Sequence, residues 1–339
     1  MSLGEFDIIA RYFAGHGSRR DVLLGIGDDA AVLEVPAGRR LVVAMDTVAA
    51  GVHYPAGTAA ADIGYRSLAV NLSDLAAMGA VPSWMTLSLS LPAARADWLE
   101  GFAGGLFQLA DRHAVALIGG DTIRGPEVVT VQIAGWVEAD GWMTRSGARP
   151  GDLVYVSGVP GEAAAGLAVI QSPLPGPTSK SGQAAAEHLR QRFLRPEPRV
   201  PLGRALRGIA SAAMDVSDGL LTDLGKLCAA SGCGATLDTD ALPESAAMRS
   251  LFDAAAVLDF ALAGGDDYEL LFTVPAERVS LLAALGSEVP CTCIGVVTEG
   301  QGAEGQGAEG QGAEGQRVIC LCAGQVLPLR RQGHDHFGS

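Results

Sequence analysis

The chain has 339 residues, of which 48% are hydrophobic and 18% are charged, so it is too apolar for a disordered protein and long enough for two domains. Its formal net charge of −14 argues against a surface that binds nucleic acid, because such a surface needs clustered lysine and arginine side chains. An acidic chain is compatible with a site that is loaded with cations.

The N-terminal sequence MSLGEFDIIARYF is typical of a short amphipathic helix and lacks the basic leader and apolar run of a signal peptide. No stretch approaches 18 uninterrupted apolar residues, so we expect no membrane span. Without a secretory leader, the six cysteines are expected to be reduced thiols of a cytoplasmic protein.

The first half of the chain alternates predicted strands with predicted helices. Asp62 is a typical helix N-cap and Gly79 is a typical helix stop. In chain order we predict a strand at 41–45, a helix at 62–77, a strand at 84–91, a helix at 95–112, and strands at 115–120 and 128–137. This alternation predicts an α/β (α+β) fold, with one domain at 1–149 and a second at 150–339.

The second half contains further predicted elements of both kinds. They are a strand at 152–158, a helix from 161, a loop at 172–183, helices at 184–194 and 199–209, a strand at 212–216, a helix at 219–231 and a strand at 268–274. The loop assignment depends on the many proline, serine and glycine residues of that segment.

A tandem five-residue repeat occupies residues 299–316 and contains no apolar side chain larger than alanine. Burial cannot offset the ordering entropy of such a segment, so we predict a flexible hairpin extension between strands at 291–298 and 317–322. Cysteine pairs flank the repeat at Cys291 and Cys293 and at Cys320 and Cys322. Two interpretations of these thiols stay open: they bind zinc, or they are buried as small apolar side chains. We favour the second interpretation.

Aspartates recur in the loops that follow predicted strands. They are Asp28, Asp29, Asp46, Asp121, Asp215, Asp218, Asp266 and Asp267. Such loops gather at one side of an α/β sheet, where two carboxylates 5 Å apart repel by about 3 kcal/mol unless cations lie between them. Asp74 lies inside a predicted helix on the face of Asn71. Oxygen ligands favour Mg²⁺ or Mn²⁺, which points to an enzyme that acts on nucleotide phosphates.

Seven segments rich in glycine and aspartate carry a family resemblance. They are GIGDDAAVL (25–33), AMDTVAAGVHY (44–54), DIGYRSLAVNLSDLAAMGAVP (62–82), GGDTIRGP (119–126), RSGARPGD (145–152), MDVSDGLLTDL (214–224) and AGGDDYELLF (263–272). Together they resemble the thiamine-monophosphate kinase family of the aminoimidazole-ribonucleotide synthetase superfamily. The resemblance is collinear from Gly4 to about Phe337 and therefore covers nearly the whole chain.

The resemblance implies a fold and an activity. The fold has an N-terminal sheet domain that dimerises and a C-terminal α/β domain. The activity is transfer of the γ-phosphoryl group of ATP to thiamine monophosphate, which gives thiamine diphosphate and ADP. The resemblance further implies a homodimer whose N-terminal sheets pair into a barrel, with neither a nucleic-acid nor a membrane partner.

The resemblance also implies roles for individual residues. Several Mg²⁺ ions are expected at Asp29, Asp46, Asp74, Asp121, Asp215 and Asp218. The positions that match ATP contacts are Gly120, Asp121, Arg145 and Ser217, and those that match contacts with the thiamine phosphate are His53, Asp266 and His334. Within these sets, Asp74, Asp121 and Asp218 are expected to be catalytic.

The chain departs from the family pattern in three places. Ala44 and Met45 stand where hydroxyl residues are usual, Asp266 is one methylene shorter than the glutamate expected there, and His334 replaces an aromatic residue. Two alternative functions stay open. The chain could be another ATP-dependent enzyme of the superfamily, or a non-catalytic protein that binds a nucleotide or thiamine phosphate.

Overall fold

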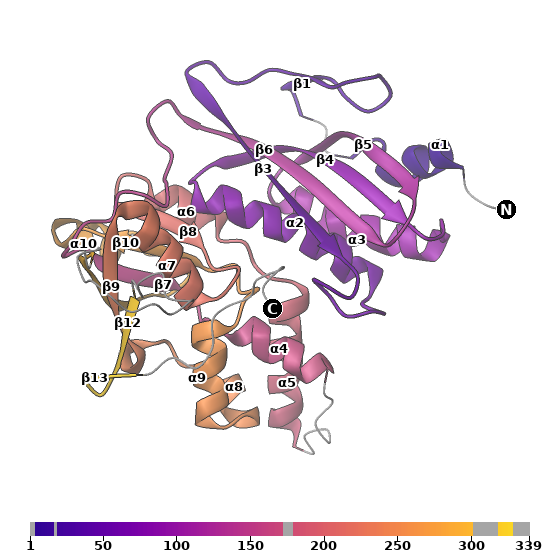
Figure 1. Ribbon diagram of the computed structural model, residues 1–339. Coiled ribbons are helices and arrows are strands. Elements are labelled where there is room, and N and C mark those ends of the chain that lie inside the picture. The colour runs from indigo at the N-terminus through magenta and orange to yellow at the C-terminus, as the bar shows by residue number, and fades with distance from the viewer. Residues whose placement is uncertain (1–3, 17–18, 172–178, 301–317, 328–339) are drawn as a thin grey trace, which may run out of the picture. The chain divides into compact units, whose positions relative to one another are not determined.

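The computed structural model describes residues 4–16, 19–171, 179–300 and 318–327 (Figure 1). The chain forms two compact units, each with its own sheet and helices. The first comprises Met1–Ala76 and Ala80–Trp142, and the second comprises Ala77–Gly79 with the described residues from Met143 onward. Both units mix helices with strands, as the sequence predicted.

A four-stranded sheet forms the centre of the first unit, in the order β3-β6-β4-β5. Its strands are β3 (Arg39–Ala49), β4 (Val81–Leu91), β5 (Ala116–Arg124) and β6 (Val128–Glu138). Only β4 and β5 run parallel to each other, because α3 (Ala96–Arg112) connects them. The smaller elements of this unit are α1 (Glu5–Ile8), a π-helix (Ile9–Phe13), β1 (Val22–Leu24) and β2 (Val32–Leu33).

The two faces of this sheet have different surroundings. Helices α2 (Ala60–Ala77) and α3 cover one face (Figure 1), where Val129, Val131 and Ile133 of β6 are fully buried. The other face is covered at one end, where Trp84 packs against β1 and β2. Beyond that end its side chains are exposed, so this sheet has one core face and one partly open face.

Helices α2 and α3 pack closely because glycines lie at their contact. A Cβ atom added at Gly64 would lie 2.1 Å from the carbonyl oxygen of Phe102, and one at Gly105 would lie 1.8 Å from that of Ala61. Such separations are well below van der Waals contact, so only glycine fits at either position.

The second unit contains a seven-stranded sheet in the order β13-β12-β9-β11-β7-β10-β8. Its strands are β7 (Leu153–Ser157), β8 (Ala212–Asp215), β9 (Cys233–Asp238), β10 (Leu270–Val274), β11 (Cys291–Glu299), β12 (Val318–Cys322) and β13 (Gln325–Val326). Neighbouring strands are antiparallel except β12 and β9. The helices are α4 (Glu162–Gln171), α5 (Lys180–Leu194), α6 (Val200–Leu206), α7 (Leu220–Ser231), α8 (Ala246–Leu251), α9 (Ala254–Ala263) and α10 (Val279–Ala284).

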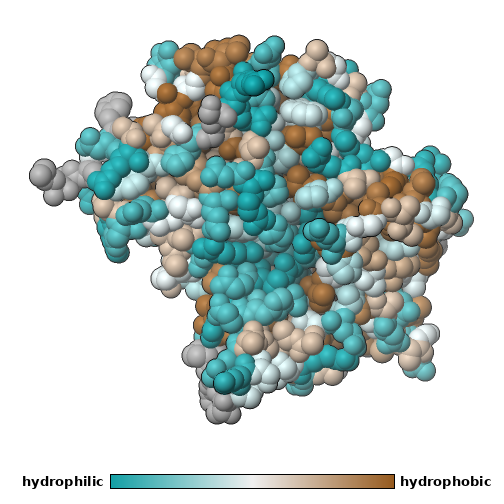
Figure 2. All heavy atoms as spheres, turned by 180° about the vertical axis from the view of Figure 1, so that it is seen from behind, coloured by the Kyte–Doolittle hydropathy of each residue, from teal (hydrophilic) through white to brown (hydrophobic). Residues whose placement is uncertain are grey.

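The helices of the second unit pack in two places. Leu220, Leu224 and Leu227 of α7 are buried against the sheet, whereas α4, α5 and α8 share a separate cluster of buried side chains. On the side of the molecule that Figure 2 shows, apolar side chains reach the surface in patches between hydrophilic ones.

Two predictions about connections are wrong. Helix α5 begins at Lys180, inside the predicted loop 172–183, because the hydroxyl of Ser179 accepts the N–H of Gly182 and caps the helix. The segments 291–298 and 317–322 do not form a hairpin, because β9 lies between β11 and β12 and pairs with both. Residues 172–178 and repeat residues 301–316 lie outside the described residues.

The position of β9 also separates the two cysteine pairs. Cys291 and Cys293 lie on β11, and Cys320 and Cys322 lie on β12, two strand spacings away. Cys320 is buried, whereas Cys293 is exposed. Among the described residues no group of three or more His, Cys, Asp or Glu side chains is arranged to hold a metal ion. Cys320 is buried like a small apolar side chain, as we favoured, whereas Cys293 is not.

Candidate functional site

The predicted site residues are divided between the two units. Those in the first unit are Asp29, Asp46, His53, Asp74, Gly120 and Asp121. Those in the second unit are Arg145, Asp215, Ser217, Asp218 and Asp266. His334 lies outside the described residues.

Asp46 lies within β3 and not in a loop after it, so that part of the prediction is wrong. The strand continues because the β-branched residues Thr47 and Val48 extend its pairing with β6. β3 is an edge strand, and the side-chain oxygen of Asn71 on α2 accepts the outward N–H of Asp46 at 3.0 Å. Asp74 follows one turn later on the same helix face, so the structure brings Asp46 and Asp74 to one corner.

Asn71 was not among the predicted site residues. It is fully buried, and its amide nitrogen donates to the carbonyl of Ser67 at 2.9 Å. This bond fixes the amide group with its oxygen toward β3. The sequence offered one signal for this role, a polar residue one turn from Asp74 on the same helix face.

Asp121 lies within β5, again inside a strand and not in the predicted loop. The strand register pairs Asp46 with Val131, Val131 with Leu87, and Leu87 with Gly120. Asp46 and Gly120 therefore lie in line across the sheet, at its two opposite edges. Three strand spacings of about 4.8 Å separate these edges by about 14 Å. Because side chains alternate along a strand, Asp121 points to the partly open face and Asp46 to the helix-covered face. The first unit therefore does not gather these aspartates by itself.

Three further predicted positions lie in or near β3. The Nδ1 atom of His53 accepts the N–H of Ala49 at 3.1 Å, so Nε2 carries the ring proton when the imidazole is neutral. Met45 is 65% exposed on the partly open face, whereas Ala44 shares the face of Asp46. Asp29 is exposed in the loop between β1 and β2.

Tyr54 supports the loop that carries His53. It is buried, and its hydroxyl donates to a carboxylate oxygen of Glu127 at 3.0 Å. Burial and the neighbouring Glu127 charge raise the pKa of Tyr54 above its ordinary value, so the hydroxyl keeps its proton and the contact.

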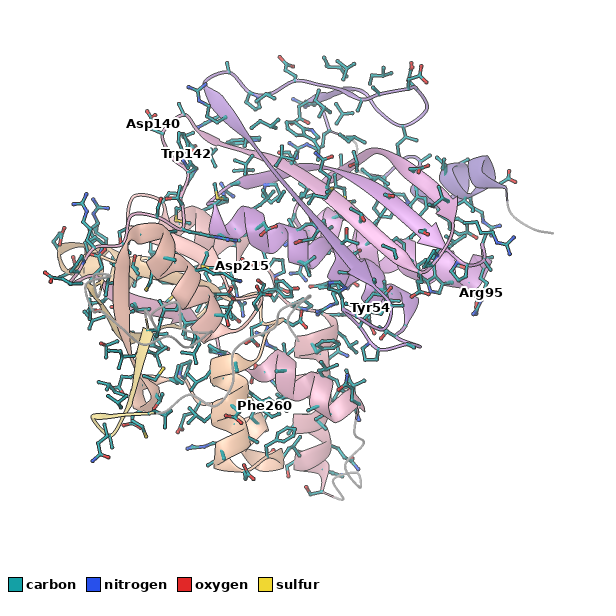
Figure 3. The ribbon with its side chains drawn as sticks, viewed as in Figure 1. Tyr54, Arg95, Asp140, Trp142, Asp215 and Phe260 are labelled. Atoms are coloured by element: carbon teal, nitrogen blue, oxygen red, sulfur yellow. The ribbon has the colours of Figure 1, made fainter. Side chains whose placement is uncertain are left out.

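In the second unit, two adjacent loops bring Asp215, Ser217, Asp218 and Asp266 together. Asp215 ends β8 and pairs with Leu270 of β10, and the N–H of Asp266 donates to the carbonyl of Ser217 at 2.8 Å. We call the loop residues 215–218 the acidic corner. It carries two of the predicted metal ligands, Asp215 and Asp218, and Figure 3 labels Asp215.

Glycines allow these loops to approach one another. A Cβ atom at Gly265 would lie 2.5 Å from the carbonyl oxygen of Ser217, and one at Gly219 would lie 2.8 Å from that of Ala263. Gly219 also has a φ of 113°, which disfavours side chains other than hydrogen. The glycines of the DVSDGL and AGGDD segments therefore serve the contact between the two loops.

Asp223 and Lys226 of α7 fix the acidic corner through hydrogen bonds and ion pairs. A carboxylate oxygen of the fully buried Asp223 accepts the N–H groups of Ser217 and Asp218 at 2.9 and 3.0 Å. The Lys226 ammonium donates to Asp223 at 2.8 Å and also to Asp218. Burial raises the pKa of Asp223 against the opposing effect of Lys226.

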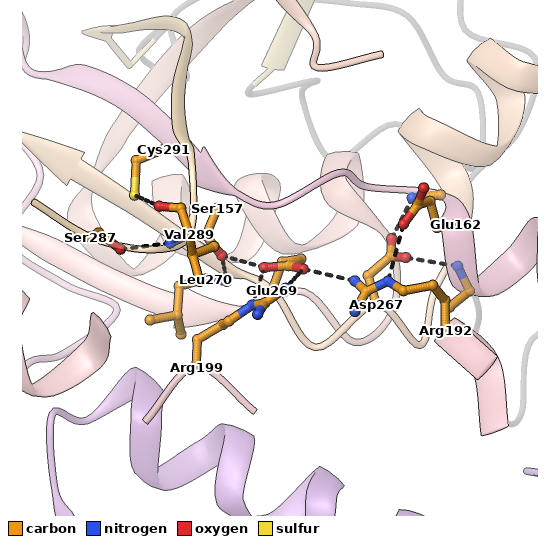
Figure 4. Close-up of polar contacts among 12 residues, drawn as sticks. Ser157, Glu162, Arg192, Arg199, Asp267, Glu269, Leu270, Ser287, Val289 and Cys291 are labelled. Atoms are coloured by element: carbon orange, nitrogen blue, oxygen red, sulfur yellow. Dashed lines mark hydrogen bonds and ion pairs between the residues drawn. The ribbon is translucent and has the colours of Figure 1, made fainter. Parts of the chain in front are cut away.

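Asp267 fixes the loop of Asp266 from its other side (Figure 4). Its buried carboxylate accepts the N–H groups of Gly161 and Ala163 at 2.6 and 3.1 Å, which caps α4. Burial raises the pKa of Asp267 to about 7. On either side of it, Asp266 and Tyr268 have φ values of 69° and 52°, a conformation that non-glycine residues adopt only under constraint.

Glu269 supplies a second constraint through a buried ion-pair network (Figure 4). It is fully buried and binds Arg192 at 2.7 Å, Arg199 at 2.5 and 2.7 Å, and the Ser157 hydroxyl at 2.5 Å. Burial alone would raise the pKa of Glu269, but the hydrogen bonds and charges of the two arginines outweigh burial and lower it. Arg192 also binds Glu162 at 3.1 Å, so the network ties α4 and α5 to the start of β10.

Arg145 lies beside the start of β8, because the N–H of Ala213 donates to the carbonyl of the preceding residue Thr144 at 2.9 Å. Arg145 is exposed, and its carbonyl accepts the hydroxyl of Ser231, the last residue of α7. Asp218 precedes the first residue of that helix, whose 12 residues span about 18 Å. Arg145 therefore lies at the end of α7 opposite to Asp218, while Asp215 ends β8 two residues after Ala213.

The chemistry of the predicted ligands fits magnesium. All six are aspartates, and oxygen-only ligands suit Mg²⁺. They are not pre-assembled into a metal-binding group within the part of the chain that the structure describes. A cavity of about 380 Å³ between Arg199 and Ser287 contains none of them.

Comparisons with known proteins identify the two halves of the chain. Residues 27–137 match the N-terminal domain of AIR synthase related proteins, and residues 149–307 match their C-terminal domain. A thiamine-monophosphate kinase of Salmonella typhimurium is 52% identical over 298 residues, which cover 87% of this chain and 90% of the relative.

Solved structures show the same relationship. The crystal structure of a thiamine-monophosphate kinase from Stenotrophomonas maltophilia K279a has a TM-score of 0.80 and 46% identity, and covers 91% of this chain and 93% of that one. A structure described as AaThiL complexed with AMPPCP and TMP has a TM-score of 0.74 and 29% identity, with 92% of each chain covered.

Proposed function

Because the chain belongs to the thiamine-monophosphate kinase family of AIR synthase related proteins, we propose that it transfers the γ-phosphoryl group of ATP to thiamine monophosphate. The products are thiamine diphosphate and ADP. The observation that carries the proposal is the fold similarity, over 92% of both chains, to a relative complexed with AMPPCP, an ATP analogue, and TMP.

The residues of the chain suit this chemistry. Phosphoryl transfer depends on positioning and on neutralising charge more than on a strong base. The acceptor phosphate, with a second pKa of about 6, is largely ionised at neutral pH. A set of aspartates with a few phosphate-binding donors is therefore sufficient, and no general base is required.

We assign the metal-binding role to the six aspartates Asp29, Asp46, Asp74, Asp121, Asp215 and Asp218. Mg²⁺ supplies electrostatic screening between the two phosphates that must approach each other. Asp74, Asp121 and Asp218 are proposed to be catalytic in this sense. The hydrogen bonds that Asp46 donates to Asn71, and that Ser217 and Asp218 donate to Asp223, support the assignment, because they orient the backbone that carries the carboxylates.

The substrate contacts are proposed by residue. Gly120, Asp121, Arg145 and Ser217 contact ATP in this proposal, and His53, Asp266 and His334 contact thiamine monophosphate. Because Nδ1 of His53 accepts the N–H of Ala49, the ring proton of a neutral imidazole lies on Nε2, and an N–H donor suits a phosphate oxygen. His334 stays a prediction from the sequence.

We further propose a homodimer formed through the first unit. β3 is an edge strand, and its exposed apolar side chains Leu41, Val43 and Met45 are 52%, 48% and 65% exposed. An apolar edge of this kind favours pairing with a second strand. Such pairing would also add the residues of a second chain to the partly open face, toward which Asp121 points.

We propose the cytoplasm as the location, on the basis of the biosynthetic reaction and of cysteines that are all free. None of the described helices has the length and apolar character that a membrane crossing requires. Neither a membrane nor a nucleic-acid partner is part of the proposed reaction.

Product analysis tests the function directly. The full chain is incubated with ATP and Mg²⁺ and with thiamine monophosphate, thiamine or an aminoimidazole ribonucleotide precursor, and the products are separated by chromatography. We expect thiamine diphosphate and ADP in equal amounts with thiamine monophosphate alone. ADP formation only with another acceptor would indicate a different enzyme of the superfamily, and binding without turnover would indicate a non-catalytic binding protein.

A further inference from the structure

A positively charged side chain of α7 already contacts the acidic corner. The ammonium group of Lys226 contacts carboxylate oxygens of both Asp218 and Asp223. The chain has 24 lysine and arginine residues, yet only Lys180 and Lys226 are lysines. One of the two lysines therefore stands beside a carboxylate that we assign to Mg²⁺.

The two carboxylates that share the ammonium differ in their surroundings. Asp223 is fully buried and also accepts the N–H groups of Ser217 and Asp218. Asp218 is 35% exposed and Lys226 is 38% exposed. A buried carboxylate that loses its cation is left with a large desolvation cost, whereas an exposed one is solvated by water. The contact with Asp223 is thus the permanent one, and the contact with Asp218 can exchange.

The chemistry of lysine suits such an exchange. An ammonium is a compact, strongly hydrated charge on a flexible stem, whereas a guanidinium binds a carboxylate through two parallel hydrogen bonds. Lysine therefore releases a carboxylate to a competing cation more readily than arginine does. The same stem lets the ammonium rotate away from Asp218 while it stays within reach of Asp223.

We propose that Lys226 is a positioning residue that neutralises Asp218 in the metal-free protein and leaves it, while remaining on Asp223, when Mg²⁺ binds. The inference rests on the proposed function, because it takes Asp218 to be a metal ligand. It also assigns Asp223 a structural role, as the anchor of Lys226 and of the acidic corner, and not a role as a ligand.

Lysine-selective NMR tests the exchange in the full chain. Protein labelled with ¹³C at the lysine ε-carbon gives two resonances, and a Lys180→Arg variant identifies which belongs to Lys226. We expect the Lys226 resonance to differ from that of free lysine without metal, and to shift on titration with Mg²⁺, alone and together with ADP. The resonance of the exposed Lys180 should not respond.

Variants test the competition by a second route. In Lys226→Met the ammonium no longer competes, so Mn²⁺ binding followed by electron paramagnetic resonance should be about two- to fivefold tighter. The melting temperature without metal should fall by about 4 °C or more, because buried Asp223 loses its cation, and Mg²⁺ should raise the melting temperature of the variant by more than it raises that of the wild type. Lys226→Arg keeps the charge but grips Asp218 more firmly, so its metal affinity should be lower than that of the wild type. Lys180→Met is the matched control.

Several results would overturn the inference. A Lys226 resonance at the free-lysine position in the metal-free protein would show that the pairing is absent. An unchanged resonance in protein that forms thiamine diphosphate with Mg²⁺ would exclude the exchange and leave the proposed function intact. Weaker Mn²⁺ binding in Lys226→Met would make Lys226 a structural support only. Failure of the wild type to form thiamine diphosphate would instead count against the proposed function.

Discussion

At the scale of single residues, the acidic corner and the Asp46–Asp74 corner make a direct prediction. Asp74→Asn and Asp218→Asn should each lower turnover by about 10²-fold or more, because each removes a charge that offsets phosphate repulsion. The fold should persist, because neither carboxylate is fully buried and asparagine has nearly the size of aspartate. Steady-state kinetics and a melting curve of each variant provide the measurement.

Two exposed aspartates on neighbouring helices supply matched controls for these variants. Asp111 lies on α3 of the first unit and Asp259 lies on α9 of the second, and both are exposed. Asp111→Asn and Asp259→Asn should retain wild-type turnover. Activity near that of the wild type in both Asp74→Asn and Asp218→Asn would contradict the assignment of the metal ligands.

Asp267 makes a prediction about pH. Burial raises the pKa of Asp267 from 3.8 to about 7 in the folded protein. The folded state therefore holds a proton that the unfolded state has lost between these values, and the stability that this proton contributes is lost as the pH rises through about 7. We call the free energy of unfolding of the wild type minus that of a variant the stability margin. For Asp267→Asn this margin should be larger at pH 6 than at pH 8, by roughly 1 kcal/mol.

Urea denaturation at the two pH values measures this margin. The control is Asp253→Asn at the exposed N-cap of α9, where asparagine can still accept the N–H of Ala256, so its margin should change little over the same range. A margin for Asp267→Asn that is constant or grows toward pH 8 would show that Asp267 is ionised throughout, held by the N–H groups of Gly161 and Ala163.

At the scale of elements, the contact between α2 and α3 depends on Gly105. A Cβ atom there would lie 1.8 Å from the carbonyl oxygen of Ala61, whereas nothing lies within 4 Å of one at Gly104. Gly105→Ala should lower the free energy of unfolding by about 1–3 kcal/mol or more, because the helices must separate. Gly104→Ala should raise it by about 0.4–1 kcal/mol, because alanine has the better helix propensity. Equal melting temperatures of the two variants would contradict this packing.

At the scale of the whole molecule, the edge strand β3 predicts the assembly. Leu41→Glu places a charge among the exposed apolar side chains of β3, so dimerisation should weaken by about tenfold or more. Leu281→Glu changes an equally exposed leucine on α10 of the second unit and should leave the dimer intact. Sedimentation velocity at several concentrations measures both. A monomeric wild type, or a dimer unaffected by Leu41→Glu, would exclude this interface.

The sequence by itself determined the family, the two-unit α/β fold and most of the elements. Alternation of apolar and polar residues placed β4 and β6, and helix signals such as Asp62 and Gly79 placed α2 within two residues. These features depend on local periodicity and on turn chemistry, which each segment carries in its own residues. The oxygen-only chemistry of the candidate ligands was likewise readable from residue types.

Only the tertiary structure decided which of these residues meet. Asp46 and Asp121 lie at opposite edges of one sheet because strand order is set by pairing across the sheet and not by distance along the chain. β9 separates β11 from β12 for the same reason. The supports at Asn71 and Glu269 also depend on contacts between segments far apart in sequence. Long-range contacts of this kind leave no periodic signal in a single sequence, so the geometry of the site became visible only in the fold.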